Sequence, residues 1–399
     1  MRRFIRVLAL AVLAATLIGV YCAAASKSKN QPFNIAVVAA DGSHSLALSS
    51  EGKLYAAGDN SEGQLGLGDA KDRDVFTLVS SLEDKKIVAI EANGECSFAL
   101  DSDGKLYVAG RNRDGQLGLG DAKERDVFTL VSSLEGKKIV AIAAGSFHSL
   151  ALDSNGKVYA AGENNVGQLG LGDKSRRWKF TEVSALSDKK IVAIAAGGSH
   201  SLALDNEGKV YASGFNEYGQ LGLGDSGRAT SRKAFTLVSS LSGKNITRIA
   251  AYYGHSLALS SKGKLYAAGF NDHGQLGLGD KDNRNNFTLA KALEGKEIVA
   301  IETGNFHSLA LDSNGKFYAT GSNGDSELGL DDNKDRDVWT LVSSLEDKKI
   351  VGVAAGDFHS LALDSDGRIY AAGRNKDGQL GLGDAKRRDV FTPIVLPNR

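Results

Sequence analysis

Residues 148–173 read HSLALDSNGKVYAAGENNVGQLGLGD, and this stretch decides the fold. It holds two short apolar runs joined at Asn155-Gly156, a dipeptide typical of a β-hairpin because both residues tolerate positive φ. Near-copies recur along the chain, and the residues equivalent to His148 are His44, Cys96, His200, His255, His307 and His359. The copies start 52 residues apart, with one interval of 55. Such regular repetition is typical of a solenoid, an array or a propeller.

Each unit carries four short runs with strand character. In residues 138–186 these runs are 138–144, 148–152, 157–161 and 180–183, and none shows a helical period. The first run is rich in small and β-branched residues, which suits a crowded inner strand. Four antiparallel strands make one blade, so we predict an all-β, seven-bladed β-propeller of four-stranded antiparallel blades over residues 34–399.

The Gly-rich end of each unit, such as 167–173, resembles a phosphate-binding loop. A phosphate loop needs a helix N-terminus directly behind it, and no helical pattern follows any of the seven copies. We therefore predict turns that need positive φ and close packing between blades. No cofactor is expected.

The composition excludes several broad classes of protein. The chain has 399 residues, of which 42% are hydrophobic, so it can bury a sizeable core and is not globally disordered. Lys and Arg number 48 and Asp and Glu also number 48. This balance gives no general drive toward nucleic acid or an anionic membrane, so we predict no nucleic-acid partner.

The first 25 residues differ from the rest of the chain. Three arginines precede an uncharged run of 19 residues over 7–25, which ends in small residues at Ala23 and Ala25. This pattern indicates a secretory signal peptide over 1–25, followed by a short linker over 26–33. An uncleaved membrane anchor is the alternative, because the run is long enough to span a bilayer. An organelle transit peptide fits less well, since the run is continuous. We expect a secreted or periplasmic protein, or otherwise a membrane-anchored one.

Patterns for catalysis are missing from the sequence. The six histidines at the repeat position are spread around a ring, so they cannot converge on one substrate, and we expect them to bond to neighbouring backbone. No Gly-x-Ser-x-Gly, His-Glu-x-x-His or Cys-x-x-Cys occurs. Cys96 fills the histidine position of its repeat and is predicted to be an inert core residue. We therefore predict that the protein is not an enzyme.

One acidic segment raises the question of a metal. Asp331 to Asp337 places oxygen side chains at alternate positions, as calcium would require. The segment lacks a turn glycine, and a similar acidic stretch occurs at the equivalent residues 121–126. We predict a solvated charged loop and no metal, with calcium as the alternative.

Because the units are near-copies, the positions that differ point to specialised surface. The loops after the first and third strands of every blade should emerge on the same rim. There, units four and five carry Phe215, Tyr218, Tyr252, Tyr253, Phe270 and His273, where other units are mostly polar. Clustered aromatic residues bury a large rigid area when a protein binds, so we predict a protein-binding rim at these six residues. The alternatives are that Phe215 and Phe270 turn inward as extra core, or that the copies have drifted.

The repeat motifs carry a family resemblance. The motifs x-His-Ser-Leu-Ala-Leu, Gly-x-Val/Leu-Tyr-Ala-Ala-Gly and Asn-x-x-Gly-Gln-Leu-Gly closely resemble the repeat of the regulator of chromosome condensation family, over about residues 34–396. The resemblance implies a seven-bladed propeller whose ring is closed by pairing the two chain ends.

The resemblance also implies several functions, which carry over unequally. Members that exchange guanine nucleotide on a small GTPase add a projecting β-wedge, whereas this chain has three extra residues in its fourth unit, within 226–233. Plant ultraviolet receptors of this fold depend on clustered tryptophans, whereas this chain has Trp178 and Trp339 alone. Secreted bacterial members that inhibit β-lactamase are the most similar in compartment and in having no domain beyond the propeller.

We therefore expect an exported, bacterial-type member that recognises or inhibits a partner protein through one propeller rim. The alternative is a guanine-nucleotide exchange factor for a small GTPase. Membrane contact is expected only if the N-terminal segment is an uncleaved anchor. The sequence assigns neither the identity of the partner nor an oligomeric state.

Overall fold

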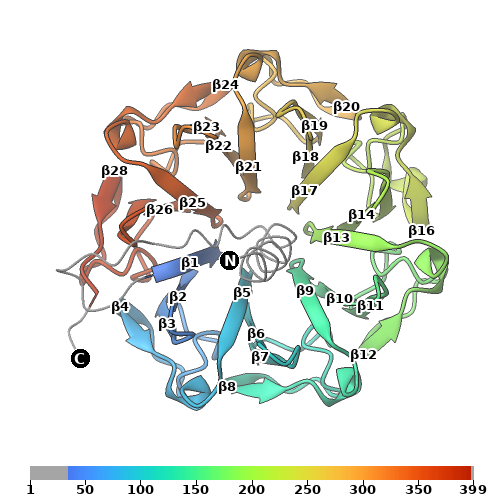
Figure 1. Ribbon diagram of the computed structural model, residues 1–399, viewed down its shortest axis with the longest axis horizontal. Coiled ribbons are helices and arrows are strands. Elements are labelled where there is room, and N and C mark those ends of the chain that lie inside the picture. The colour runs from blue at the N-terminus through green and yellow to red at the C-terminus, as the bar shows by residue number, and fades with distance from the viewer. Residues whose placement is uncertain (1–34, 397–399) are drawn as a thin grey trace, which may run out of the picture.

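The computed structural model describes residues 35–396, which form seven sheets around a central axis (Figure 1). Each sheet has four antiparallel strands that follow one another in sequence order from the axis to the outer wall. The prediction of an all-β, seven-bladed propeller is confirmed. The predicted signal peptide (1–25) and linker (26–33) lie outside the described residues. In the part of the chain that is described, no helix is long and apolar enough to cross a membrane.

Strands at the same place in each blade have almost the same length. The innermost strands are β1 (Ile35–Asp41), β5 (Ile87–Asn93), β9 (Ile139–Ala144), β13 (Ile191–Ala196), β17 (Ile246–Tyr252), β21 (Ile298–Thr303) and β25 (Ile350–Ala355). The second strands are β2 (His44–Ser49), β6 (Cys96–Asp101), β10 (His148–Asp153), β14 (His200–Asp205), β18 (His255–Ser260), β22 (His307–Asp312) and β26 (His359–Asp364). The third strands are β3 (Leu54–Gly58), β7 (Leu106–Gly110), β11 (Val158–Gly162), β15 (Val210–Gly214), β19 (Leu265–Gly269), β23 (Phe317–Gly321) and β27 (Ile369–Gly373).

The outer wall is made of the fourth strands and short 3₁₀ turns. The fourth strands are β4 (Arg73–Leu78), β8 (Arg125–Leu130), β12 (Arg177–Glu182), β16 (Arg232–Leu237), β20 (Arg284–Leu289), β24 (Arg336–Leu341) and β28 (Arg388–Pro393). The turns that follow them are η1 (Ser80–Leu82), η2 (Ser132–Leu134), η3 (Ser184–Leu186), η5 (Ser239–Leu241), η6 (Lys291–Leu293) and η7 (Ser343–Leu345). The three extra residues of the fourth unit add one further turn, η4 (Arg228–Thr230), and no wedge.

The hydrophobic core is divided among the contacts between neighbouring blades. Between the first two blades, for example, Leu46 and Leu54 pack against Ile90 and Phe128. The other neighbouring pairs repeat this arrangement. A single blade therefore cannot bury its apolar faces alone, and the repeats stabilise one another.

The ring closes differently from the sequence-based expectation. All four strands of the first blade come from the first repeat and all four of the last blade come from the seventh, so within residues 35–396 no sheet joins the first repeat to the last. The first and last blades instead pack face to face, with Ile35 and Phe76 buried against Leu361. A bridge between Val75 and Leu382 joins their outer parts, as equivalent bridges do for every other neighbouring pair.

The Gly-rich loop closes on itself and packs against the next blade. Asn60 is fully buried; its Nδ2 donates to the Asp69 carbonyl (2.8 Å), and its Oδ1 accepts from the Leu65 N–H (2.9 Å). Gly66 has φ +67°, and a Cβ there would lie 2.3 Å from the Phe128 ring of the next blade. The loop needs these glycines for backbone conformation and close approach, as predicted.

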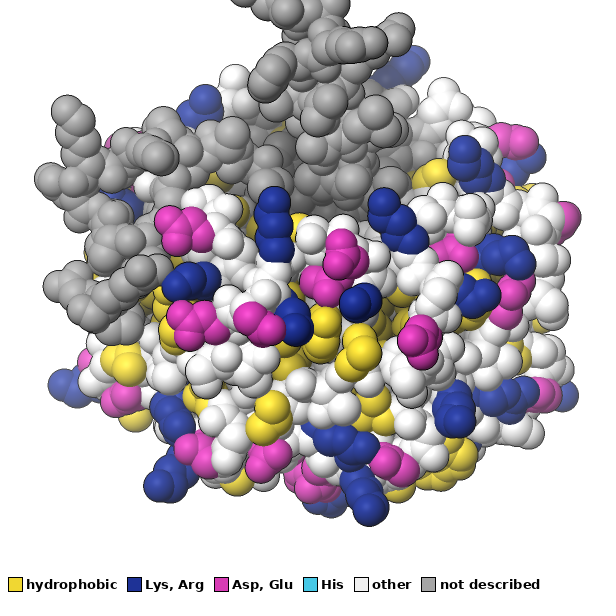
Figure 2. Space-filling view, turned by 60° about the horizontal axis from the view of Figure 1, so that its bottom comes forward, with side chains coloured by type: hydrophobic (Ala, Val, Ile, Leu, Met, Phe, Trp, Pro, Cys, Tyr) yellow, Lys and Arg dark blue, Asp and Glu magenta, His cyan; other side chains and the backbone are white. Residues whose placement is uncertain are grey.

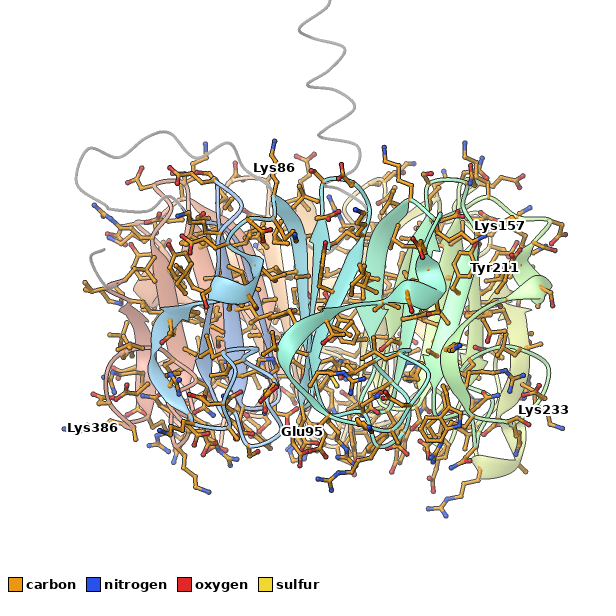
Figure 3. All side chains as sticks on the ribbon, turned by 90° about the horizontal axis from the view of Figure 1, so that it is seen from below. Lys86, Glu95, Lys157, Tyr211, Lys233 and Lys386 are labelled. Carbon is orange, nitrogen blue, oxygen red and sulfur yellow. The ribbon has the colours of Figure 1, made fainter. Side chains whose placement is uncertain are left out.

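The two rims of the propeller carry different loops. Glu95, in the loop after a first strand, lies on one face of the propeller, and Lys86, which follows a fourth strand, lies on the opposite face (Figure 3). The loops after first and third strands share one rim, which we call the loop rim; ring contacts between Tyr253 and Phe270 join the two kinds of loop there. On the side shown in Figure 2, basic and acidic side chains are interspersed, in keeping with zero net charge.

Candidate protein-binding rim and central channel

Histidine side chains link the blades just beneath the loop rim. Each Nε2 lies within hydrogen-bond distance of a serine Oγ in the next blade, whereas the sequence suggested neighbouring backbone; His44 alone among them also has backbone contacts, with Gly94 and Cys96. The links are His44–Ser97, His148–Ser201, His200–Ser256, His255–Ser308, His307–Ser360 and His359–Ser45, each 2.8 or 2.9 Å long. We call this set the histidine–serine ring.

The hydrogen-bond pattern determines which nitrogen carries the proton. Ser201 Oγ donates its single proton to the Gln168 carbonyl (2.7 Å), so His148 Nε2 must be the donor toward Ser201. Burial lowers the pKa of His148 to about 3, which keeps the imidazole neutral. The histidines therefore act as neutral struts between blades.

The ring is open between the second and third blades. Cys96 replaces histidine there, and its Sγ lies 3.2 Å from the Arg111 carbonyl. Ser149, the serine left without a histidine, still donates to the Gln116 carbonyl (2.8 Å). Burial raises the pKa of the Cys96 thiol, which keeps it protonated, as expected for an inert core residue.

Five of the six predicted rim residues form one continuous cluster. Phe215 meets Tyr218 edge to face with ring centroids 6.3 Å apart, and Tyr218 lies 4.8 Å from Phe270. Phe270 in turn contacts Tyr253 (6.4 Å) and His273 (6.3 Å). Phe215 and Phe270 are partly exposed and do not join the cores between blades.

A sixth aromatic side chain completes the cluster, and comparison of the seven repeats did not identify it. Phe306 of the sixth blade lies 4.9 Å from His273 and 5.2 Å from Tyr253. Phenylalanine also occupies this place in two other repeats, at Phe147 and Phe358, so Phe306 did not stand out. We call the whole cluster the aromatic sector; its members are Phe215, Tyr218, Tyr253, Phe270, His273 and Phe306.

Tyr253 has a strained backbone at the centre of the aromatic sector. It is the first residue of a two-residue hairpin turn and has φ +36°, while its side chain is 44% exposed. The two other turns of this length carry glycine at that position, Gly42 and Gly94, with φ +51° and +53°. A bulky residue in this conformation is an outlier, and such strain gathers at functional sites.

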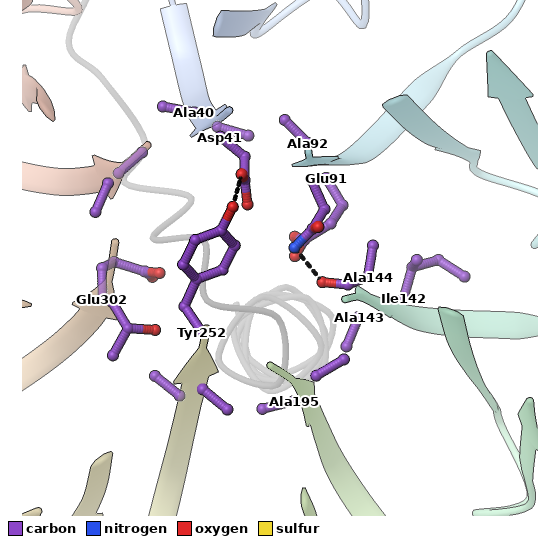
Figure 4. Close-up of a pocket in the computed structure, with 18 of the residues that line it drawn as sticks. Ala40, Asp41, Glu91, Ala92, Ile142, Ala143, Ala144, Ala195, Tyr252 and Glu302 are labelled. Carbon is purple, nitrogen blue, oxygen red and sulfur yellow. Dashed lines mark hydrogen bonds between the residues drawn. The ribbon is translucent and has the colours of Figure 1, made fainter. Parts of the chain in front are cut away.

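Tyr252 does not join the cluster, although it was predicted to lie with the others. Its side chain is 6% exposed and crosses the end of the central channel (Figure 4). The phenol lies within hydrogen-bond distance of Asp41 Oδ1 in the first blade and 2.8 Å from Asp357 Oδ1 in the last. One phenol proton cannot serve both carboxylates. Burial raises the pKa of Asp41 and of Asp357, so the pair can hold the second proton.

The other side of the loop rim is held by ion pairs. Arg374, at the position equivalent to Phe270, forms a two-pronged pair with Asp325 at 2.8 and 3.1 Å and lies 4.0 Å over the Phe358 ring. Arg111 pairs with Glu95 at 2.7 Å. The charged side chains of this sector therefore already have oppositely charged partners within the chain.

The segment Asp331 to Asp337 follows the pattern of its equivalents. Asp332 pairs with Arg336 at 2.8 Å and accepts from Asn323 Nδ2 at 3.0 Å, and Asp121 with Arg125 repeats the contact at 2.7 Å. In the described residues, no group of three or more potential ligands is placed to hold a metal ion. The structure thus accounts for the acidic segment by ion pairs that recur in other blades.

The central channel contains further acidic groups. A cavity of about 110 Å³ lies on the axis and is lined by the inner strands of all seven blades. Glu91 and Glu302 project into it from opposite sides (Figure 4). Burial raises the pKa of Glu91 to about 8, and burial together with the charge of Glu91 raises that of Glu302.

Comparison with known proteins gives the chain a family. The model of the RCC1-like domain matches residues 21–300 and 182–399. The chain is 34% identical over 375 residues to the ultraviolet-B receptor UVR8 of Arabidopsis thaliana, covering 93% of this chain and 84% of the receptor. It is 30% identical over 389 residues to a secretion-regulating guanine nucleotide exchange factor of Bos taurus, covering 88% and 80%.

Solved structures agree with these relatives. Prp20p of Saccharomyces cerevisiae, studied for its binding to Gsp1p and histones, superposes with a TM-score of 0.77 at 27% identity, covering 94% of this chain and 87% of Prp20p. Some relatives are far longer proteins, among them an E3 ubiquitin-protein ligase of which the chain spans 7%. The relatives are mostly binding or exchange-factor proteins. By the match of its repeats along nearly the whole chain and by its seven four-stranded blades, the chain belongs to the RCC1-like domain family.

Proposed function

We propose that this protein is an exported protein-binding module that recognises or inhibits a partner protein through the aromatic sector of its loop rim. The observation that carries the proposal is Tyr253: an exposed aromatic side chain held on a left-handed backbone within a continuous cluster of rings. Nothing in the blade requires this residue, because two equivalent turns use glycine. Aromatic residues at the centre of a contact surface carry much of the binding energy in protein complexes.

Two further observations support the proposal. Prp20p, with the same fold, binds other proteins. Export rests on the basic and apolar pattern of residues 1–25. The relatives named above are eukaryotic, so the analogy with secreted bacterial inhibitors rests on that N-terminal pattern alone.

Guanine-nucleotide exchange on a small GTPase is the second candidate, favoured by the 30% identity to the exchange factor of Bos taurus. The extra turn η4 of the fourth blade, where Arg228 pairs with Glu217 at 3.1 Å, is a short addition beside the aromatic sector. If exchange is the function, the protein should accelerate release of labelled GDP from at least one member of a panel of small GTPases.

The decisive experiment compares two substitutions at one repeat position. Phe270→Ser copies Ser322 of the sixth blade, and Arg374→Ser makes the same change in the charged sector. Partners captured from native extracellular or periplasmic fractions by the wild type are identified, purified and titrated against all three proteins. We expect Phe270→Ser to weaken binding about 30-fold, a loss of about 2 kcal/mol, and Arg374→Ser to change it little.

Other outcomes would separate the candidates. Equal binding by both variants would overturn the assignment of the aromatic sector. N-terminal sequencing of the native protein should give a mature chain that starts at Ser26 in an exported fraction. An intact cytosolic chain that stimulates GDP release would replace the proposal with nucleotide exchange.

A further inference from the structure

One position of the inner strands, which lines the central channel, differs between the blades. Five blades place alanine there, and two blades place glutamate, Glu91 and Glu302. The alanines are Ala39, Ala143, Ala195, Ala250 and Ala354. Since alanine satisfies the fold in five blades, the two glutamates are not needed to build the inner strand. Both are partly exposed, and the space they face is the cavity on the axis.

A second group in the same cavity lacks a partner. Asn93 is 3% exposed, and its Nδ2 donates to the Ala144 carbonyl. Its Oδ1 has no hydrogen-bond partner among the described residues, although it lines the cavity. Buried acceptors are nearly always paired, so this oxygen marks a place where a donor fits. Once the glutamates are ionised, their oxygens and the amide oxygen together offer acceptors and negative charge.

We propose that the channel binds a guanidinium or alkylammonium group, such as an arginine or lysine side chain presented by a peptide, between Glu91 and Glu302 with Asn93 Oδ1 as a third acceptor. A guanidinium has five N–H donors and a fixed positive charge, which matches acceptors that converge from two sides. This site lies on the axis and is separate from the aromatic sector.

Occupation of the site should release protons. Burial raises the pKa of both glutamates in the free protein, that of Glu91 to about 8. A bound cation favours the ionised carboxylates, so affinity should rise from about pH 6 to about pH 9. The other titratable and charged groups around the site are Asp41, Asp357 and Tyr252 at the channel end and Arg248, whose charge lowers the pKa of Glu302. Arg248 opposes cation binding and limits its strength.

The test uses the full chain and a defined probe, the tripeptide Gly-Arg-Gly amide, with its uncharged citrulline analogue as control. Isoleucines that line the cavity serve as reporters after methyl labelling: Ile90, Ile142, Ile194, Ile249 and Ile301. We expect saturable shifts of these methyl signals with the arginine peptide and none with the citrulline peptide. Affinity should fall at least about tenfold in Glu91→Ala or Glu302→Ala, and both variants should fold because they restore the alanine of the other blades.

Three results would overturn the proposal: no shift with the arginine peptide, equal shifts with the citrulline peptide, or unchanged affinity in both glutamate variants. Phe270→Ser should bind the arginine peptide as the wild type does. A loss of partner binding in that variant with intact peptide binding would therefore separate the channel site from the function proposed for the rim.

Discussion

The loop rim and the histidine–serine ring are built from adjacent positions of each repeat. The residues of the ring are nearly the same in all blades, whereas those of the rim vary from blade to blade. The residue before the repeat histidine is serine, glutamate, phenylalanine or glycine, depending on the blade. The next position is histidine in six of seven blades, and each of those histidines bonds to a serine of the following blade. The histidine position therefore faces the interior, whereas the position before it is partly exposed in six of the seven blades.

This difference separates what builds the propeller from what the propeller can bind. Loss of a serine from the ring leaves the N–H of a buried histidine unpaired, which costs free energy. A rim residue is free to change because polar and aromatic side chains both fit there, as Arg374 and Phe270 show at equivalent positions. We therefore expect substitutions in the ring to change stability, and substitutions in the aromatic sector to change binding.

The largest effect should come from acid. Burial lowers the pKa of five ring histidines to about 3 and that of His44 to about 4, from 6.5. Below about pH 6.5 the unfolded chain binds protons that the folded ring excludes, so stability falls as the pH falls. Each histidine should cost on the order of 2 kcal/mol at about pH 5. Urea unfolding at a series of pH values measures this loss.

The channel carboxyls should act in the opposite direction. Their raised pKa values mean that the folded protein holds protons which the unfolded chain releases, so their contribution is lost as the pH rises toward about 8. The double variant Glu91→Ala, Glu302→Ala should flatten the alkaline limb and leave the acid limb in place. If the free energy of unfolding does not decrease when the pH is lowered below about 6, the ring histidines are not held neutral in the folded protein.

A smaller effect should distinguish two serines of the ring. Ser256→Ala removes the acceptor of His200, which then keeps an unpaired buried N–H, so we expect a loss of roughly 1–3 kcal/mol in the free energy of unfolding. Ser149→Ala is the matched control, because Cys96 has already removed its histidine, and it should cost less. Partner binding should not change in either variant. Equal losses would mean that the histidine link adds nothing to stability.

The sequence was sufficient for the repeated part of the molecule. Seven copies of one motif predict seven blades, four strands in each and the rim on which the variable loops lie. Ring closure was not predictable in this way, because packing of the first blade on the last depends on where the repeat begins within a blade. The histidine–serine links were also missed, since a contact between residues 53 positions apart leaves no local pattern.

The site shows the same limit. Phe215, Tyr218, Tyr253, Phe270 and His273 were found because they depart from their repeat, and the structure brings them together. Tyr252 also departs from its repeat. Because successive side chains along a strand point in opposite directions, however, its ring enters the channel while that of the adjacent Tyr253 is exposed on the rim. Departure from a repeat therefore identifies unusual residues without telling which surface they serve.

The smallest expected change in stability is also the sharpest test of the aromatic sector. Tyr253→Gly restores the residue found at Gly42 and Gly94, which relieves the left-handed backbone but removes ring contacts to Phe270 and Phe306. The two effects oppose each other, so the free energy of unfolding should change by less than about 1 kcal/mol. Partner binding should nevertheless weaken at least about tenfold, measured with the partner used for Phe270→Ser. If Tyr253→Gly raises the free energy of unfolding and leaves partner binding unchanged, Tyr253 does not contact the partner and is not part of the binding surface.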